Sequence, residues 1–123
     1  MASPLGGFDN AESAIAIGVQ SGLNALKACA KTPSVKRFVY TSSSLAATFP
    51  KPNVEFSIDT NSYNEVAVEI VNKEPSKKGL FIYAAMKTQA EKAMWKWMEE
   101  NKPGFVLNTI VGLIRSCCSL YRR

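Results

Sequence analysis

Two short apolar runs, separated by a stretch long enough to hold a helix, constrain the fold of this chain more than any other feature. The first, FVYT at residues 38–41, leads directly into three serines, and the second is FVLNTIV at residues 105–111. Runs of this length and composition are typical of strands buried in a parallel sheet. A strand, a long crossover and a second strand form a unit that is almost always right-handed, with parallel strands. The sequence therefore predicts an α/β fold with a short parallel sheet.

A long helix is expected before the first strand. Apolar residues recur at helical spacing over residues 11–30, directly after Asp9 and Asn10, whose side chains can cap a helix. Pro33 follows, and its ring disfavours helical geometry at the preceding residue. The predicted helix therefore ends at about residue 30.

A second long helix is expected over residues 83–101, which are rich in Ala, Met, Glu and Lys and are followed by a Lys-Pro-Gly stop signal. Residues 45–82 are irregular, except that residues 62–73 have enough periodicity for a short helix. The serines after the first strand read as a polar loop. A long connection of this kind is more often functional than idle.

Charge and cysteine content exclude several classes of protein. The net charge is +5, but three basic residues lie in the last nine, and the lysines elsewhere are interspersed with glutamates. Charge dispersed in this way is typical of a solvated surface and not of a nucleic-acid site. Three cysteines without histidine match neither a disulfide framework nor a metal site. With no signal peptide or membrane-length apolar segment, we expect a cytoplasmic protein with no metal, nucleic-acid or membrane partner.

Tyr83 and Lys87 stand one helical turn apart at the start of the second long helix. Reduction of a carbonyl by a nicotinamide needs an acid that protonates the oxygen as hydride reaches the carbon. A free phenol has a pKa of about 10, and a nearby ammonium brings that pKa towards neutrality by favouring the phenolate. A serine hydroxyl at the end of the preceding strand would complete such a site by polarising the carbonyl oxygen.

The same residues also have a purely structural interpretation. Short motifs often occur by chance, and a chain with four tyrosines and eleven lysines can contain a Tyr-x-x-x-Lys pair without any functional role. Lys87 would then be a solvated surface residue, and the serines would form a turn, since hydroxyls bond readily to nearby backbone. The residue pattern alone leaves both interpretations open.

Four longer stretches carry a more specific signal: ASPLGG, SGLNALKACAKTPSVKRFVYTSSSLAATFPKPN, DTNSYNEVAVEIV and YAAMKTQAEKAMWKWMEENKPGFVLNTIV. Their order resembles the extended short-chain dehydrogenase/reductase family of the NAD-dependent epimerase/dehydratase type. Within it, the chain looks like the fungal aldehyde and ketone reductases and the dihydroflavonol-reductase-like proteins. The resemblance covers nearly all of residues 2–111. It implies a partial Rossmann-like domain and NAD(P)-dependent reduction of a small-molecule carbonyl substrate.

The resemblance also implies roles for individual residues. Tyr83 matches the proton donor, and Lys87 matches the residue that lowers the tyrosine pKa and binds the cofactor ribose. Ser43 matches the carbonyl-polarising serine, with Ser42 or Ser44 as alternatives if the register slips by one. Tyr63 falls in the substrate-side loop. The implied cofactor is NADP(H), with NAD(H) as the alternative, bound through Ala2, Ser3, Asn24, Thr41, Ser42, Tyr83 and Lys87.

Asn24 matches the asparagine of the family's Gly-Thr-x-Asn pattern, although Leu23 replaces the threonine. An asparagine within an apolar helix face is locally unfavourable, which fits a site-supporting role. A tolerated helix asparagine is the other interpretation. Trp95 and Trp97 are expected to pack in the core.

The chain departs from the family at both ends. It has no glycine-rich turn of the kind that holds the pyrophosphate at a helix N-terminus, and no substrate lobe after residue 111. We therefore expect residues 1–112 to be a central fragment of a truncated reductase domain and residues 113–123 to be a basic tail unlike the family. Little or no activity is expected from such a chain alone. The alternative is a non-catalytic interaction module that pairs or self-associates through the open edges of its sheet.

Overall fold

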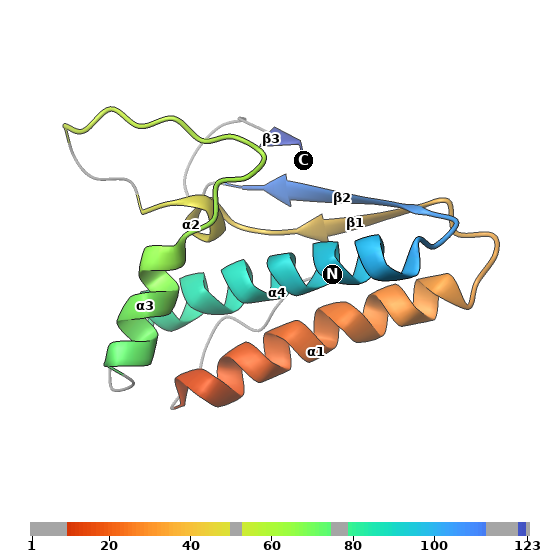
Figure 1. The fold of residues 1–123 in the computed structure, drawn as a ribbon, viewed down its shortest axis with the longest axis horizontal. Helices are drawn as coiled ribbons and strands as arrows, with labels where there is room; N and C mark the ends of the chain where they lie inside the picture. Colours follow the sequence, from red (N-terminus) through yellow and green to blue (C-terminus); the bar gives the residue numbers. More distant parts are fainter. Residues whose placement is uncertain (1–9, 50–52, 75–78, 113–120, 123) are drawn as a thin grey trace.

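The computed structural model describes residues 10–49, 53–74, 79–112 and 121–122. The strands β1 (Arg37–Thr41) and β2 (Val106–Val111) are parallel neighbours, and β3 (Tyr121–Arg122) pairs antiparallel with the end of β2. The helices are α1 (Ala11–Ala30), α2 (Ser44–Ala47), α3 (Glu65–Lys73) and α4 (Leu80–Asn101). The α/β fold predicted from the sequence is confirmed (Figure 1).

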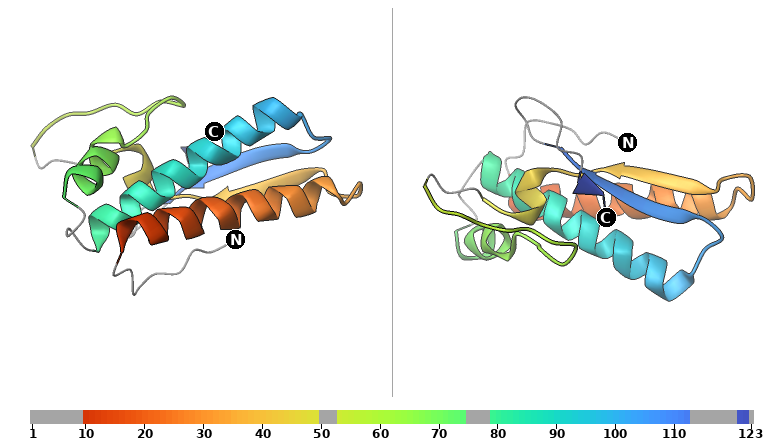
Figure 2. Two further views of the ribbon diagram at one scale, coloured as in Figure 1. Left: turned by 60° about the horizontal axis from the view of Figure 1, so that its bottom comes forward. Right: turned by 90° about the horizontal axis from the view of Figure 1, so that it is seen from above.

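The helices α1 and α4 lie side by side on one face of the sheet, and α3 packs against α4 near its start (Figures 1 and 2). Two apolar clusters fill the space between these layers. The first joins the beginnings of α1 and α4 to α2 and α3, through Ala11, Ala14, Leu45, Ala67, Val71, Ile82, Ala84 and Ala85. The second joins the later parts of both long helices to the sheet, through Leu26, Tyr40, Met94, Phe105 and Leu107.

The strands are buried on one face of the sheet only. Side chains that point towards the helices, such as Tyr40 and Leu107, are buried. Their neighbours point the other way: Val39 is 41% exposed and Val106 is 52% exposed. Successive side chains in a strand point to opposite faces, so helices on one face can bury only alternate positions. In the described part of the chain, the outer face therefore exposes Val39 and Val106 beside Arg37 and Asn108, whose side chains share a hydrogen bond of 2.7 Å.

Helix boundaries follow the capping residues. The predicted bounds of α1 are confirmed, and the Asn10 side chain accepts a hydrogen bond from the Glu12 backbone N–H at 2.9 Å. Helix α3 begins three residues later than predicted, because Asn64 is its N-cap and accepts from the Ala67 N–H at 3.1 Å. Helix α4 begins three residues earlier than predicted, at Leu80, and its C-terminus agrees with the prediction.

Two short elements have no counterpart in the sequence prediction. The serine run, expected to be a polar loop, instead begins the four-residue helix α2 with Ser43 as its N-cap. The strand β3 lies in the tail that was expected to be unlike the family, and its two residues pair with Ile110 and Val111. Neither element is long enough to leave a periodic pattern in the sequence.

Two glycines allow α1 and α4 to approach closely. A Cβ atom added at Gly18 would lie 2.5 Å from Met86 Cγ, and one at Gly22 would lie 2.7 Å from Met94 Sδ. Both methionines are buried, so their side chains have little room to move away. The absence of a side chain at these two positions therefore sets the separation of the helices. In the described ranges, no helix has both the length and the apolar character needed to cross a membrane.

Candidate functional site

Lys87 lies where the carboxyl end of β1 meets α4. Its side chain points at the sheet and is 3% exposed, and its ammonium donates a hydrogen bond to the Thr41 carbonyl at 3.0 Å. The Lys87 Nζ atom is 5.0 Å from the centre of the Tyr40 ring and 5.8 Å from the centre of the Tyr83 ring. The interpretation of Lys87 as a solvated surface residue is therefore wrong.

Tyr83 lies in the first turn of α4, where its N–H donates to the Gly79 carbonyl at 3.0 Å. Its half-buried ring packs against the first apolar cluster, and this packing limits its motion. Lys87 follows one turn later on the same side of the helix, so the ammonium stays near the ring. The structure thus brings together the tyrosine and the lysine that the sequence singles out.

Burial lowers the pKa of Lys87 below its ordinary value of 10.5, and the nearby Glu91 carboxylate opposes this by raising it. The unfolded chain therefore holds the lysine proton up to a higher pH than the folded chain. Folding stability should consequently rise with pH between the lowered pKa and 10.5. We expect this rise in urea unfolding measured over alkaline pH, and we expect it to be absent from Lys87→Met. The control is Lys92→Met, at a lysine side chain that is 40% exposed. Identical pH dependence in wild type and Lys87→Met would contradict the expectation.

The three serines after β1 have different environments. Ser42 is buried, and its hydroxyl reaches across to α4 and donates to Glu91 Oε2 at 2.6 Å. Ser43 is also buried, and its Oγ accepts from the Leu45 backbone N–H at 3.3 Å. Ser44 is the first residue of α2 and is half-buried. The turn interpretation therefore describes Ser43 in part, whereas Ser42 makes a contact between distant segments.

Glu91 is the residue of this region that sequence reasoning missed. It is 1% exposed and lies one turn after Lys87. One turn further, the Trp95 indole N–H donates to Thr109 Oγ1 of β2 at 3.1 Å. Lys87, Glu91 and Trp95 thus form a polar row along the face of α4 that meets the sheet. The four-residue spacing of Glu91 from Lys87 is a signal in the sequence, but glutamates interspersed with lysines are also typical of a solvated helix surface.

The helix α2 is held in place by two further residues that sequence reasoning did not select. The Ala46 carbonyl accepts a hydrogen bond from the Asn64 backbone N–H at 2.8 Å. Thr88 Oγ1 lies 3.3 Å from the same carbonyl and shares its one hydrogen between it and the Ala84 carbonyl at 2.8 Å. The Asn64 amide also donates to the Leu45 carbonyl at 2.8 Å. Both Asn64 and Thr88 are buried. These bonds fix the segment that begins at Ser43 against α3 and α4.

Other predicted site residues lie elsewhere. Asn24 is exposed, and its side-chain oxygen accepts from Gln20 Nε2 at 2.7 Å, so it does not interrupt an apolar face and does not meet Lys87. Ala2 and Ser3 fall outside the described residues. Trp95 and Trp97 pack against the second apolar cluster, as expected.

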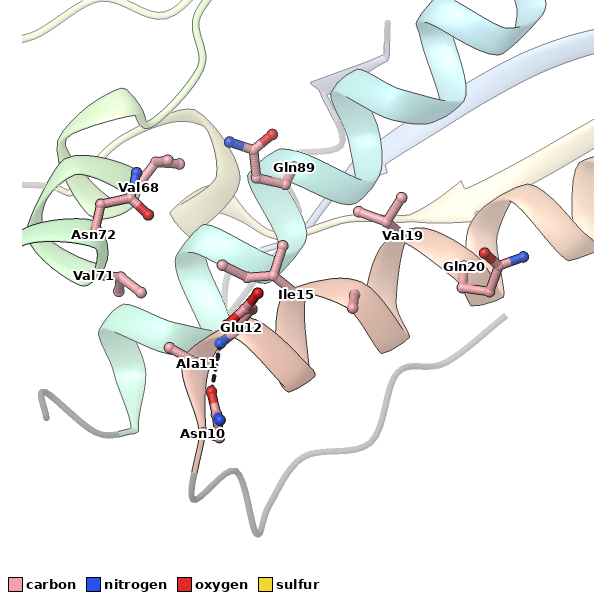
Figure 3. A pocket seen from close by; sticks show the side chains of 11 residues that line it. Asn10, Ala11, Glu12, Ile15, Val19, Gln20, Val68, Val71, Asn72 and Gln89 are labelled. Atoms are coloured by element: carbon pink, nitrogen blue, oxygen red, sulfur yellow. Dashed lines mark hydrogen bonds between the residues drawn. The ribbon is translucent and has the colours of Figure 1, made fainter. Parts of the chain in front are cut away.

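Two hollows lie near these elements. Tyr63 lines a pocket of about 300 Å³ together with Phe49, beside the end of α2. A larger groove of about 830 Å³ runs between α1, α3 and Gln89 of α4 (Figure 3). It contains none of the predicted site residues, so we do not assign the chemistry to it. The described part of the chain contains no group of three His, Cys, Asp or Glu side chains that could hold a metal ion.

The known proteins that this chain resembles include reductases and NAD-dependent epimerase/dehydratases. The chain is 52% identical over 93 residues to Aldehyde reductase 2 of Sporidiobolus salmonicolor, a match that covers 72% of this chain and 27% of the relative. It is 42% identical over 89 residues to an NAD-dependent epimerase/dehydratase of Aspergillus terreus, covering 70% of this chain and 26% of the relative. The structure of a yeast methylglyoxal/isovaleraldehyde reductase complexed with NADPH matches with a TM-score of 0.70 at 24% identity, over 89% of this chain and 33% of that one. No family model matches the chain.

The two-stranded parallel sheet and its crossover helices match part of a Rossmann-fold reductase. More narrowly, the chain is homologous to part of the aldehyde and ketone reductases of the NAD-dependent epimerase/dehydratase type. The family resemblance seen in the sequence is therefore confirmed. The chain spans about a quarter of the length of the two curated relatives described here.

Proposed function

We propose that this chain carries the catalytic segment of an NAD(P)-dependent carbonyl reductase. The observation that supports it most directly is the buried ammonium of Lys87 beside the Tyr83 ring, at the end of a strand that leads into serines. In the proposed reaction, the bound nicotinamide supplies a hydride to the carbonyl carbon. The Tyr83 hydroxyl gives its proton to the carbonyl oxygen, and the product is the alcohol. The positive charge of Lys87 stabilises the phenolate that Tyr83 leaves behind.

The hydrogen-bonding of the serines favours Ser43 as the group that polarises the carbonyl. A serine hydroxyl has one hydrogen to donate. Ser42 gives that hydrogen to Glu91, whereas Ser43 uses a lone pair to accept from the Leu45 N–H. The Ser43 hydroxyl can therefore still donate to a substrate oxygen.

Lys87 also suits the proposed contact with a cofactor ribose. An ammonium has three N–H donors, and the bond to the Thr41 carbonyl uses one of them. The Thr41 backbone thereby orients the ammonium while leaving donors for ribose hydroxyls. NADPH is the proposed cofactor because the matching yeast reductase structure is complexed with it, and NAD is the alternative suggested by the name of the Aspergillus relative. The small-molecule carbonyl is the proposed partner.

Transfer of this chain into a complete relative tests the proposal. The matched 93-residue segment of the Sporidiobolus aldehyde reductase is replaced by the corresponding residues of this chain, and aldehyde-dependent loss of NADPH absorbance is followed. We expect the chimera to be active. We expect no appreciable reduction from the 123-residue chain alone, since its sequence has no glycine-rich turn to hold the pyrophosphate. A folded but inactive chimera would contradict the proposed function, and robust turnover by the chain alone would contradict the second expectation.

A non-catalytic interaction module is the second candidate function, and the open face of the sheet favours it. Val39 and Val106 expose large apolar side chains on that face. Exposed apolar side chains on a sheet promote association with another chain, and the adjoining Arg37 and Asn108 offer polar contacts to such a partner. Sedimentation of the purified chain with and without NADPH, combined with the fluorescence of Trp95 and Trp97, separates the two candidates. A stable oligomer that ignores the cofactor would favour the module, and a fluorescence change with NADPH would favour the reductase.

A further inference from the structure

Glu91 is an acidic side chain buried at the centre of the interface between α4 and the sheet, with 1% of its surface exposed. A carboxylate in such a place is costly unless nearby groups compensate its charge. The Ser42 hydroxyl donates to one of its carboxylate oxygens, Oε2, at 2.6 Å, so this buried oxygen has a hydrogen-bond partner. The Ser42 hydroxyl is therefore one of the groups that compensate the burial of Glu91.

The surroundings of the Lys87 ammonium show where that charge acts. The titratable groups that face it in the described ranges are Tyr40 from β1, and Tyr83 and Glu91 from α4. Glu91 is the carboxylate among them. It opposes the effect of burial, which would otherwise favour the neutral amine of Lys87.

Glu91 is also connected to Lys87 through the backbone of one short segment. Ser42, which donates to Glu91, directly follows Thr41, whose carbonyl accepts from Lys87. Two consecutive residues at the end of β1 thus bind two residues one turn apart on α4. A shift of either residue would disturb both contacts.

From this geometry we propose that Glu91 is a positioning residue, which keeps Lys87 charged and fixes the end of β1 so that the ammonium stays beside Tyr83. The consequence for catalysis rests on the proposed function, whereas the effect on the charge of Lys87 can be measured without any cofactor. Glu91 itself has no contact with a reacting atom in this scheme.

The test is an NMR pH titration of the full chain labelled with ¹³C at lysine Cε, with the Lys87 signal identified by its loss in Lys87→Arg. In Glu91→Gln, which keeps the shape of the side chain, we expect Lys87 to lose its proton at a lower pH than in wild type. Glu91→Asp retains the charge and should fall between the two. Glu99→Gln makes the same chemical change at an exposed position of α4 and should leave the Lys87 midpoint unchanged.

The order of the variants distinguishes positioning from packing. If Glu91 only filled space, the shorter aspartate would disturb Lys87 more than the isosteric glutamine, and that order would overturn the proposal. An unchanged Lys87 midpoint in folded Glu91→Gln would also overturn it. Should Glu91→Gln fail to fold, the acid limb of the wild-type titration decides. A second step in the Lys87 Cε chemical shift at acid pH, where the Glu91 carboxylate takes up a proton, would support the proposal. The absence of such a step would overturn it.

In the chimera, Glu91→Gln should move the alkaline limb of the kcat profile to lower pH, since Lys87 loses its charge earlier. A shifted Lys87 midpoint in the chain, combined with an inactive chimera, would support the role of Glu91 and count against the proposed function. A failure of the proposed role of Glu91 can therefore be distinguished from a failure of the proposed reductase function.

Discussion

Replacing Tyr83 by phenylalanine in the reductase chimera should lower kcat for aldehyde reduction by about 10²–10⁴-fold, the usual contribution of a positioned general acid. The change removes one hydroxyl and leaves the ring that packs against the first apolar cluster. The fold should therefore be retained. The affinity for NADPH should fall much less than kcat, because Lys87, which is proposed to contact the ribose, is retained. Steady-state kinetics together with NADPH titration would show a loss that lies mainly in kcat.

The chain contains a matched control for this prediction. Tyr63 also lies beside a lysine, with Lys92 Nζ at 5.6 Å from its ring centre, compared with 5.8 Å for Lys87 and Tyr83. Lys92 is exposed and pairs with Glu65 at 2.6 Å, whereas Lys87 is buried. Tyr63→Phe should leave kcat within a few-fold of the parent chimera. Equal losses of kcat in the two variants would show that proximity to a lysine does not identify the acid.

Replacing Gly22 by leucine should lower the free energy of unfolding of the chain by about 3 kcal/mol, at the upper end of the usual cost of overpacking. On helix propensity alone, leucine would stabilise α1 by roughly 1 kcal/mol relative to glycine. Overpacking and helix propensity change the free energy of unfolding in opposite directions. The sign of the measured change therefore shows whether α1 and α4 are in close contact at Gly22. A Cβ at this position already lies 2.7 Å from Met94 Sδ, and Met94 is fully buried. Urea unfolding measures the difference.

Ser21→Leu, at the neighbouring exposed position of the same helix, serves as the control and should change stability by less than about 0.5 kcal/mol. Met94→Ala in the Gly22→Leu background should recover part of the loss, since it removes the side chain that leucine would strike. The cost of the double variant should therefore be smaller than the sum of the single costs. A stabilised Gly22→Leu variant would mean that α1 and α4 are not in close contact at Gly22.

The fold was predictable where its signals are local. Asn10, the apolar spacing after it and Pro33 were enough to predict both ends of α1, and the two apolar runs predicted the parallel strand pair. The two strand sequences do not by themselves show which face of the sheet is open, because FVYT and FVLNTIV contain apolar residues at positions that point both ways. Their composition indicates strands enclosed on both faces, whereas the described helices cover one.

The candidate site was predictable to a similar extent. Tyr83 and Lys87 are connected by one turn of helix, so their proximity follows from their spacing. The bond between Ser42 and Glu91 joins residues 49 positions apart, and no local pattern contains that information. A match to a family pattern can also mislead. Asn24 matches the family's asparagine, but in this structure it is exposed and its side-chain oxygen accepts a hydrogen bond from Gln20. The roles of Ser43, Tyr83 and Lys87 remain predictions.

The polar row on α4 has a consequence for how the helix is oriented. Residues spaced by four advance about 400° around an α-helix, so each member is offset by about 40° from the one before it. Lys87 and Glu91 bind the end of β1, and Trp95 binds Thr109 on β2, so the row passes from one strand to the other as it winds. Apolar packing alone would tolerate a small rotation of α4 about its long axis. Three directional hydrogen bonds, two to the end of β1 and one to β2, oppose such a rotation. They thereby set the direction in which α4 presents the Tyr83 side chain.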